Sequence, residues 1–167
     1  IYNIVPILEA SGLHYVLDLG NELSPPSGPG AWNNYAKRMW ENYVFVFGNT
    51  KTVGFSLPPG SGRAENLHNI YGNNPPHLFE LHAYDNPYNN LIDIDRKMDT
   101  LGYRVQGWVI GEAYYNDAYS ASQISAAITN SYRTGHYLVQ WPLSANRMCS
   151  DVDVIPTSFQ NYINYGF

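Results

Sequence analysis

Short apolar runs alternate along this chain with segments whose apolar residues recur at the period of an α-helix. The clearest helical segment covers residues 32–47, where apolar side chains fall three or four positions apart until Gly48 ends the pattern. The predicted strands are residues 13–19, 52–57, 77–84, 105–110 and 137–141. This alternation predicts an α/β fold with about five parallel strands and right-handed crossovers.

The other helices are predicted from the same period and from the glycines that follow most of them. They are residues 2–11, 63–71, 91–101, 122–132 and 158–164. Residues 24–30 hold three prolines and two glycines and are predicted to be a loop. Asp85, Asp93 and Asp95 are interpreted as capping or solvating the helix that begins near residue 91.

Length and charge limit what the chain can do. The 167 residues can bury one sizeable core, so residues 1–167 are interpreted as a single domain, shorter than an eight-stranded α/β barrel of typical size. Only 14% of the residues are charged, and the nine Lys and Arg are scattered under a net charge of −5. We therefore expect no nucleic acid partner. No apolar run approaches the roughly 20 residues of a membrane span, so we expect no membrane partner.

The lone Cys149 excludes an internal disulfide and says little about the compartment. The first residues lack the pattern of a signal peptide. Because the chain begins at Ile1 rather than Met, we interpret it as a processed product, an expressed segment or a fragment, without choosing among them.

Each predicted strand ends near a residue that can take part in chemistry. In parallel α/β sheets the carboxyl ends of the strands meet at one edge, where ligand sites lie. Two glutamates at such an edge can supply the acid/base and nucleophilic groups that cleavage of a sugar acetal requires. The strand-end residues are Asn21 with Glu22, Ser56, His82 with Tyr84, Glu112, and Gln140 with Trp141.

The order of these groups resembles strands 4, 6, 7 and 8 of the clan A glycoside hydrolases: Asn-Glu, His-x-Tyr two units later, Gly-Glu, and then Trp. Those enzymes are retaining β-glycosidases on an eight-stranded α/β barrel. The likeness extends over about residues 8 to 143 and covers only strands 4 to 8. It implies a partial (half) TIM barrel and a glycosidase without a cofactor, acting on poly- or oligosaccharides. The motifs are somewhat closer to the heparanase-like branch than to the cellulase-like one.

The resemblance also implies a role for each residue. Glu22 would be the general acid/base and Glu112 the nucleophile. Asn21 would hydrogen-bond the sugar hydroxyl beside the anomeric carbon, Tyr84 would hold the nucleophile's carboxylate, and Trp141 would form the platform under the sugar. A nucleophile must stay ionised, which a tyrosine donor favours, while an acid must keep its proton, which partial burial favours.

Barrel geometry gives a separate check on the glutamate pair. In a closed eight-stranded barrel, strands three places apart have backbones roughly 14 Å apart across the mouth. Inward glutamates would then leave about 5 to 6 Å between their carboxyl groups, close to the separation of about 5 to 5.5 Å in retaining enzymes. This estimate assumes closure, which five strands do not provide.

Several residues have a plain alternative reading. His82 is a substrate-binding candidate, and equally an ordinary hydrogen-bonded residue at a strand end. His77 and His82 lie at an odd separation on one strand and so face opposite sides, so no metal site is expected. Ser56 lacks a nucleophile elbow and is interpreted as lining the pocket. Residues 59–62 are not a phosphate loop, because no Lys-Ser or Lys-Thr follows.

Strands 1 to 3 of the family barrel have no counterpart here, so the outer predicted strands would leave apolar edges that invite association. We expect a homo-oligomer, a complementary N-terminal half, or a terminal segment to cover them. Three hypotheses remain: a retaining β-glycosidase, an inactive carbohydrate-binding remnant, and a structural half-barrel without a ligand. A secreted or periplasmic location follows only from the family, and the sugar and its linkage stay open.

Overall fold

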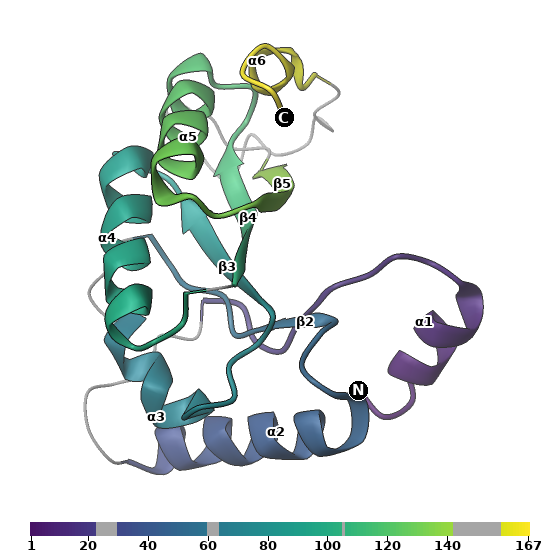
Figure 1. Ribbon diagram of the computed structural model, residues 1–167. Helices are drawn as coiled ribbons and strands as arrows, with labels where there is room; N and C mark the ends of the chain where they lie inside the picture. Colours follow the sequence, from purple (N-terminus) through teal and green to yellow (C-terminus); the bar gives the residue numbers. More distant parts are fainter. Residues whose placement is uncertain (23–29, 60–63, 105, 142–157) are drawn as a thin grey trace.

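The computed structural model describes residues 1–22, 30–59, 64–104, 106–141 and 158–167. Some predictions fall outside these ranges: most of the loop at 24–30, most of the stretch at 59–62, the start of the helix at 63, the strand residue 105, and Cys149. In the described part, parallel strands alternate with helices, which confirms the predicted α/β class (Figure 1).

The strands form two parallel groups joined by a backbone bridge. The first group is β1 (Leu17–Asp18) with β2 (Thr52–Gly54), and the second is β3 (Leu78–Ala83), β4 (Gly107–Tyr114) and β5 (Gly135–Trp141) in that order. Beyond β2, the amide of Leu57 donates to the carbonyl of Glu80 and the amide of His82 donates to the carbonyl of Leu57, each at 3.0 Å. The strands therefore follow one another in chain order, and the described residues do not close a barrel.

Helices cover one side of the three-stranded sheet. The helices are α1 (Val5–Ser11), α2 (Ala31–Phe47), the 3₁₀-helix η1 (Ala64–Leu67), α3 (His68–Tyr71), α4 (Pro87–Thr100), α5 (Ala118–Ser131) and α6 (Gln160–Ile163). In Figure 1, α4 and α5 lie side by side against β3 to β5, and no described helix lies against the other face of these strands. None of the described helices has the length and apolar content needed to cross a membrane.

Most element boundaries differ from the prediction. β1 keeps only Leu17–Asp18 of the strand predicted at 13–19, and β2 only Thr52–Gly54 of the strand predicted at 52–57. Two further differences have a clear cause. β4 runs on to Tyr114, past the predicted end at residue 110, because it pairs with β3 on one side and β5 on the other. Gly111 and Glu112 interrupt the apolar run in the sequence, but the hydrogen bonds of two neighbouring strands override that signal. α4 begins at Pro87, before the predicted residue 91, since proline at the first helical position fixes a helical φ.

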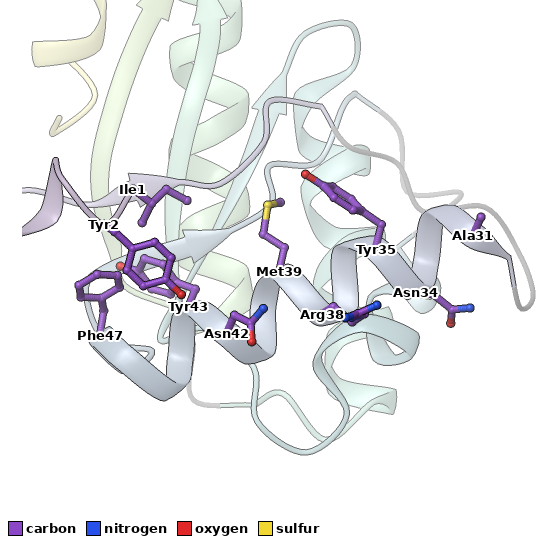
Figure 2. A pocket seen from close by; sticks show the side chains of 10 residues that line it. All are labelled: Ile1, Tyr2, Ala31, Asn34, Tyr35, Arg38, Met39, Asn42, Tyr43 and Phe47. Carbon is purple, nitrogen blue, oxygen red and sulfur yellow. The ribbon is translucent and has the colours of Figure 1, made fainter.

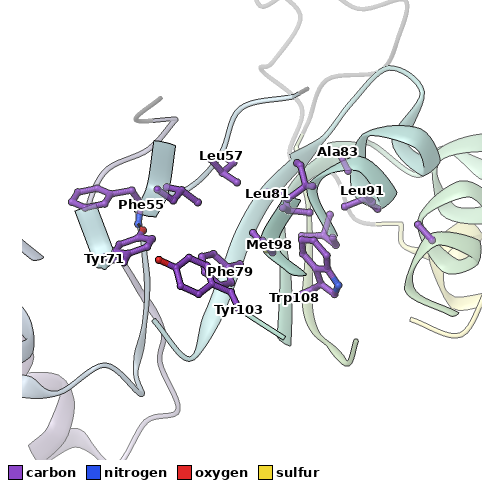
Figure 3. Packing of buried hydrophobic residues seen from close by; sticks show 14 of the residues in the cluster. Phe55, Leu57, Tyr71, Phe79, Leu81, Ala83, Leu91, Met98, Tyr103 and Trp108 are labelled. Carbon is purple, nitrogen blue, oxygen red and sulfur yellow. Dashed lines mark hydrogen bonds between the residues drawn. The ribbon is translucent and has the colours of Figure 1, made fainter. Parts of the chain in front are cut away.

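Aromatic side chains fill the core between the strands and the helices (Figure 3). The ring of Tyr71 stacks on Phe55 with centroids 6.3 Å apart and meets the edge of Trp40 at 4.9 Å. On β3, Phe79 stacks on Tyr103 at 5.7 Å. Burying one such side chain stabilises the fold by roughly 1.5–3 kcal/mol, so this cluster positions the strands that carry the polar strand-end residues.

The buried side chain of Arg133, which follows α5, links α4 to the segment between α4 and β4. Arg133, whose side chain is 3% exposed, pairs with Asp95 and Asp99 of α4. Its guanidinium also donates to the carbonyls of Tyr103 and Gln106, at 3.0 Å each. The prediction that Asp95 caps or solvates α4 is therefore wrong, because its carboxylate is engaged by this arginine.

Gly54 has two structural constraints, which predicts an unusual sensitivity to substitution. Its φ of +70° lies in the left-handed region, and a Cβ there would collide with the hydroxyl of Tyr71. That hydroxyl accepts a 2.9 Å hydrogen bond from the amide of Phe55. We expect Gly54→Ala to lower the free energy of unfolding by about 3 kcal/mol, combining backbone strain with overpacking. Urea denaturation followed by circular dichroism measures this loss.

Gly12 provides the matched control, because its φ is also +70° while nothing lies within 4 Å of a Cβ at that position. Gly12→Ala should cost only the backbone term, about 1 kcal/mol. Equal losses for the two variants would contradict the close approach of Tyr71.

Candidate functional site

Glu22 is placed by a tight turn after β1. Its backbone has a φ of +51°, which is uncommon for a residue with a side chain. The amide of Glu22 donates to Ser56 Oγ at 2.8 Å, and Asp18 Oδ1 accepts from the amide of Gly20 at 2.8 Å. These bonds hold the turn in place. Ser56 thus supports the backbone of Glu22, whereas the sequence suggested only a pocket-lining hydroxyl.

Glu112 lies within β4 rather than beyond its end, and its side chain is 19% exposed. Tyr84, which follows β3, donates its hydroxyl to Glu112 Oε2 at 2.7 Å. Burial, followed by this bond to a carboxylate, raises the pKa of Tyr84. The phenol therefore keeps its proton and remains a donor to Glu112.

His82 joins the two glutamates. Its side chain is fully buried, and its Nδ1 lies 2.8 Å from Glu22 Oε1 and 3.5 Å from Glu112 Oε2. These residues come from three elements: the turn after β1, β3 and β4. The structure therefore brings together Glu22, His82, Tyr84 and Glu112, which the sequence placed only at the same edge of the sheet.

The surrounding carboxylates decide the protonation of His82. Burial by itself lowers the pKa of His82, but the carboxylates of Glu80, Glu22 and Glu112 outweigh burial and raise the pKa above 6.5. The ring is thus favoured as an imidazolium that donates to Glu22. Glu22, with a side chain 42% exposed, stays open to solvent on its other side.

This raised pKa predicts how stability depends on pH. A protonated His82 contributes stability that is fully present below its unfolded value of 6.5 and is lost as the pH rises through its higher folded value. We expect the difference in free energy of unfolding between the wild type and His82→Gln to shrink over that window, by about 1.4 kcal/mol for each unit between the two values. Denaturant titrations at a series of pH values measure it. An unchanged difference across the window would contradict the assignment, and exposed His14→Gln is the control.

Asn21 and Trp141 lie at the same ends of their strands without joining this hydrogen-bonded cluster in the described part of the chain. Asn21 precedes Glu22 in the turn and is exposed. Trp141 ends β5, is 45% exposed and lies opposite Tyr114 in register. Both side chains are exposed in the described part of the chain, as contact with a ligand requires. Gln140, another strand-end residue, instead donates to the carbonyl of Ser158, at 2.7 Å, and accepts from the amide of Asn116.

Glu80 is a neighbour of the site that sequence reasoning missed. Its side chain is 15% exposed, and its Oε1 lies 3.8 Å from His82 Nε2. The sequence does contain a feature that could have identified it: a glutamate inside an apolar strand. It lies two positions before His82 and hence on the same face of the strand. Glu80 also lines a hollow of about 350 Å³ with Asp18, Val109 and Tyr137.

One group of described residues has donor atoms close enough to hold a metal ion: one atom each from Glu22, His82 and Glu112, all within 4.8 Å of one another. Direct hydrogen bonds already engage these atoms, from His82 to Glu22 and from Tyr84 to Glu112. Each carboxylate thus has a hydrogen-bond donor without an ion. The expectation of no metal stays a prediction.

The hollow shown in Figure 2 lies elsewhere, between α2 and the first residues of the chain. It has a volume of about 470 Å³ and is lined by Tyr2, Tyr35, Met39, Tyr43 and other residues, with Arg38 as its ionised side chain. None of the described residues that line it carries a carboxylate or an imidazole. We therefore place the candidate chemistry at the glutamate cluster.

Comparisons of the chain with protein-family models, with curated proteins and with solved structures found no match.

Proposed function

We propose that this chain is a glycoside hydrolase-like domain that cleaves β-glycosidic bonds with retention, through Glu22 as acid/base and Glu112 as nucleophile. The observation that carries the proposal is the geometry of this pair. One oxygen of each carboxylate lies within 4.8 Å of an oxygen of the other. A close approach of this kind fits carboxyl groups about 5–5.5 Å apart, as in retaining enzymes, better than the spacing of about 6.5–9.5 Å in inverting ones.

In the first step, a carboxylate oxygen of Glu112 attacks the anomeric carbon as the bond to the leaving oxygen breaks. Glu22 gives that oxygen its proton, and a glycosyl ester forms on Glu112. In the second step, Glu22 takes a proton from water, whose oxygen attacks the anomeric carbon and releases Glu112. Two displacements on the same carbon return the original β configuration.

The surroundings of the two carboxylates fit this division of roles. Glu112 is the more buried of the two, and the 2.7 Å bond that it accepts from Tyr84 fixes the position of its carboxylate. Glu22 is 42% exposed, so water can reach it for the second step. His82 contacts both groups and can share its proton with Glu22.

The ligand class is proposed from the flanking groups. Trp141 and Tyr84 offer flat faces of the type on which sugar rings stack, and Asn21 offers a neutral donor and acceptor beside Glu22. We assign poly- or oligosaccharides as substrates, with no separate cofactor.

The sheet is proposed to be half of an α/β barrel whose inner face lacks its cover. Tyr137, Val139 and Trp141 alternate along one face of β5 and are 48%, 50% and 45% exposed. No described helix covers that face in Figure 1. We propose that a second copy or a complementary N-terminal half covers it. Size-exclusion chromatography with light scattering tests self-association, and a well-behaved monomer would argue against the second copy.

The function is tested by incubating the chain with aryl β-glycosides and following the sugar product by NMR. Release of phenol with the β-anomer formed first supports the proposal, whereas the α-anomer would show inversion and contradict it. Binding of oligosaccharide without turnover would instead identify a carbohydrate-binding remnant. Glu41→Gln, an exposed substitution on α2, is the control for general effects.

A further inference from the structure

Glu80 lies beneath His82 on the side away from the glutamate pair. His82 Nδ1 faces Glu22 and Glu112, while Nε2 is buried without a hydrogen-bond partner and has Glu80 Oε1 at 3.8 Å. An imidazolium therefore has carboxylates on both sides of its ring. An opposite charge within about 4–6 Å favours the protonated ring.

The neighbouring strand leaves room for this carboxylate. A Cβ on Gly111 of β4 would collide with Glu80 Oε1. Any other residue at position 111 would displace the carboxylate of Glu80 from its place beside the His82 ring. Gly111 directly precedes Glu112, so one short segment of β4 both carries the proposed nucleophile and admits Glu80.

We infer that Glu80 is a positioning residue that holds the proton shared by His82 and Glu22, and so sets the alkaline limit of catalysis. The inference rests on the proposed role of Glu22. Glu22 gives its proton to the leaving oxygen, so the pair must contain a proton when substrate binds. Glu80 makes that proton harder to lose as the pH rises. One proton lies between the two groups, in the 2.8 Å contact of His82 Nδ1 with Glu22 Oε1.

Among the described residues, the charged or titratable groups around His82 belong to this cluster. Glu22 comes from the turn after β1, Glu80 from β3 itself, and Glu112 from β4, with Tyr84 reaching the ring only through Glu112. Asp18 on β1 lines the same hollow as Glu80. Glu80 forms no hydrogen bond to Glu22 or Glu112 among the described residues, while its Oε1 lies 3.8 Å from His82 Nε2, so replacing it changes the surroundings of the His82 proton first.

The first test is an NMR titration of the His82 ring in ¹⁵N-histidine-labelled protein, with the signal assigned from its loss in His82→Gln. We expect Glu80→Gln to move the midpoint to lower pH and Glu41→Gln to leave it in place. Equal midpoints in all three proteins would overturn the inference. If Glu80→Gln does not fold, Gly111→Ala displaces the same carboxylate and is expected to shift the midpoint in the same direction, with no shift again overturning it.

The second test is the pH profile of kcat/KM. In Glu80→Gln, the ratio of activity at about pH 8 to activity at about pH 6 should fall roughly tenfold, while a purely structural role would lower both values alike. An unchanged ratio contradicts the inference. The two tests distinguish the two claims. A wild-type protein without turnover would contradict the proposed function. The NMR titration would still decide whether Glu80 keeps the proton on His82.

Discussion

Glu112→Ala is expected to lower kcat on aryl β-glycosides by about 10⁴-fold or more, because no covalent glycosyl intermediate can then form. The protein should stay folded, since the side chain of Glu112 is partly exposed and its polar contacts in the described site are one hydrogen bond with Tyr84 and one ion pair with His82. Initial rates measured by phenol release, with circular dichroism as a check on folding, test this. A loss below about tenfold would contradict the nucleophile assignment.

Reaction with azide distinguishes the roles of Glu112 and Glu22. In Glu112→Ala, azide can enter the space left by the nucleophile and attack the anomeric carbon once, which gives an α-glycosyl azide. In the matched variant Glu22→Ala, the glycosyl ester still forms from a substrate with a good leaving group, and azide then gives the β-glycosyl azide. NMR of the products identifies the anomer. The opposite pattern would exchange the two roles.

Arg133→Ala is expected to lower the free energy of unfolding by about 3–5 kcal/mol, the largest effect on stability that we predict. The substitution leaves Asp95, with a side chain 13% exposed, without its cation. It also removes the donor from the carbonyls of Tyr103 and Gln106 and the contact with the ring of Trp108, 5.4 Å away. The melting temperature should fall by roughly 10 °C.

Arg96→Ala is the matched control on α4. Arg96 pairs with Asp93 at 3.6 Å, but its side chain is 75% exposed. Exposed pairs of this kind contribute about 0–1 kcal/mol. A loss for Arg133→Ala no greater than the loss for Arg96→Ala would contradict the buried network.

The sequence predicted the α/β class and the edge of the sheet that carries the site. The period of the apolar residues shows which side chains of a segment are buried, and so indicates whether the segment is a strand or a helix. For this reason β3, α2 and β5 lie close to where they are predicted. Glu22 and Glu112 come together for the same reason, because parallel strands end at one edge. The half-barrel and the roles of these residues stay predictions.

Other features depend on contacts between residues far apart in the chain. His82 meets Glu22 across 60 positions, and no local pattern indicates that its ring would lie between two carboxylates. In the sequence, Glu80 is only a polar residue that interrupts an apolar strand. Its position in the structure depends on Gly111 of the next strand, because a residue with a side chain there would collide with it. Asp95 reads as a solvated helix residue until Arg133 is placed against it.

The most direct test of the proposed mechanism is to label the chain with an aryl 2-deoxy-2-fluoro-β-glycoside, which slows release of a glycosyl ester. Mass spectrometry of the intact protein and of its peptides locates any label. We predict one fluorosugar per chain, bound to Glu112, and no label in Glu112→Ala. A label on Glu22 or another residue, or no label while the parent glycoside is hydrolysed, would contradict the proposed mechanism.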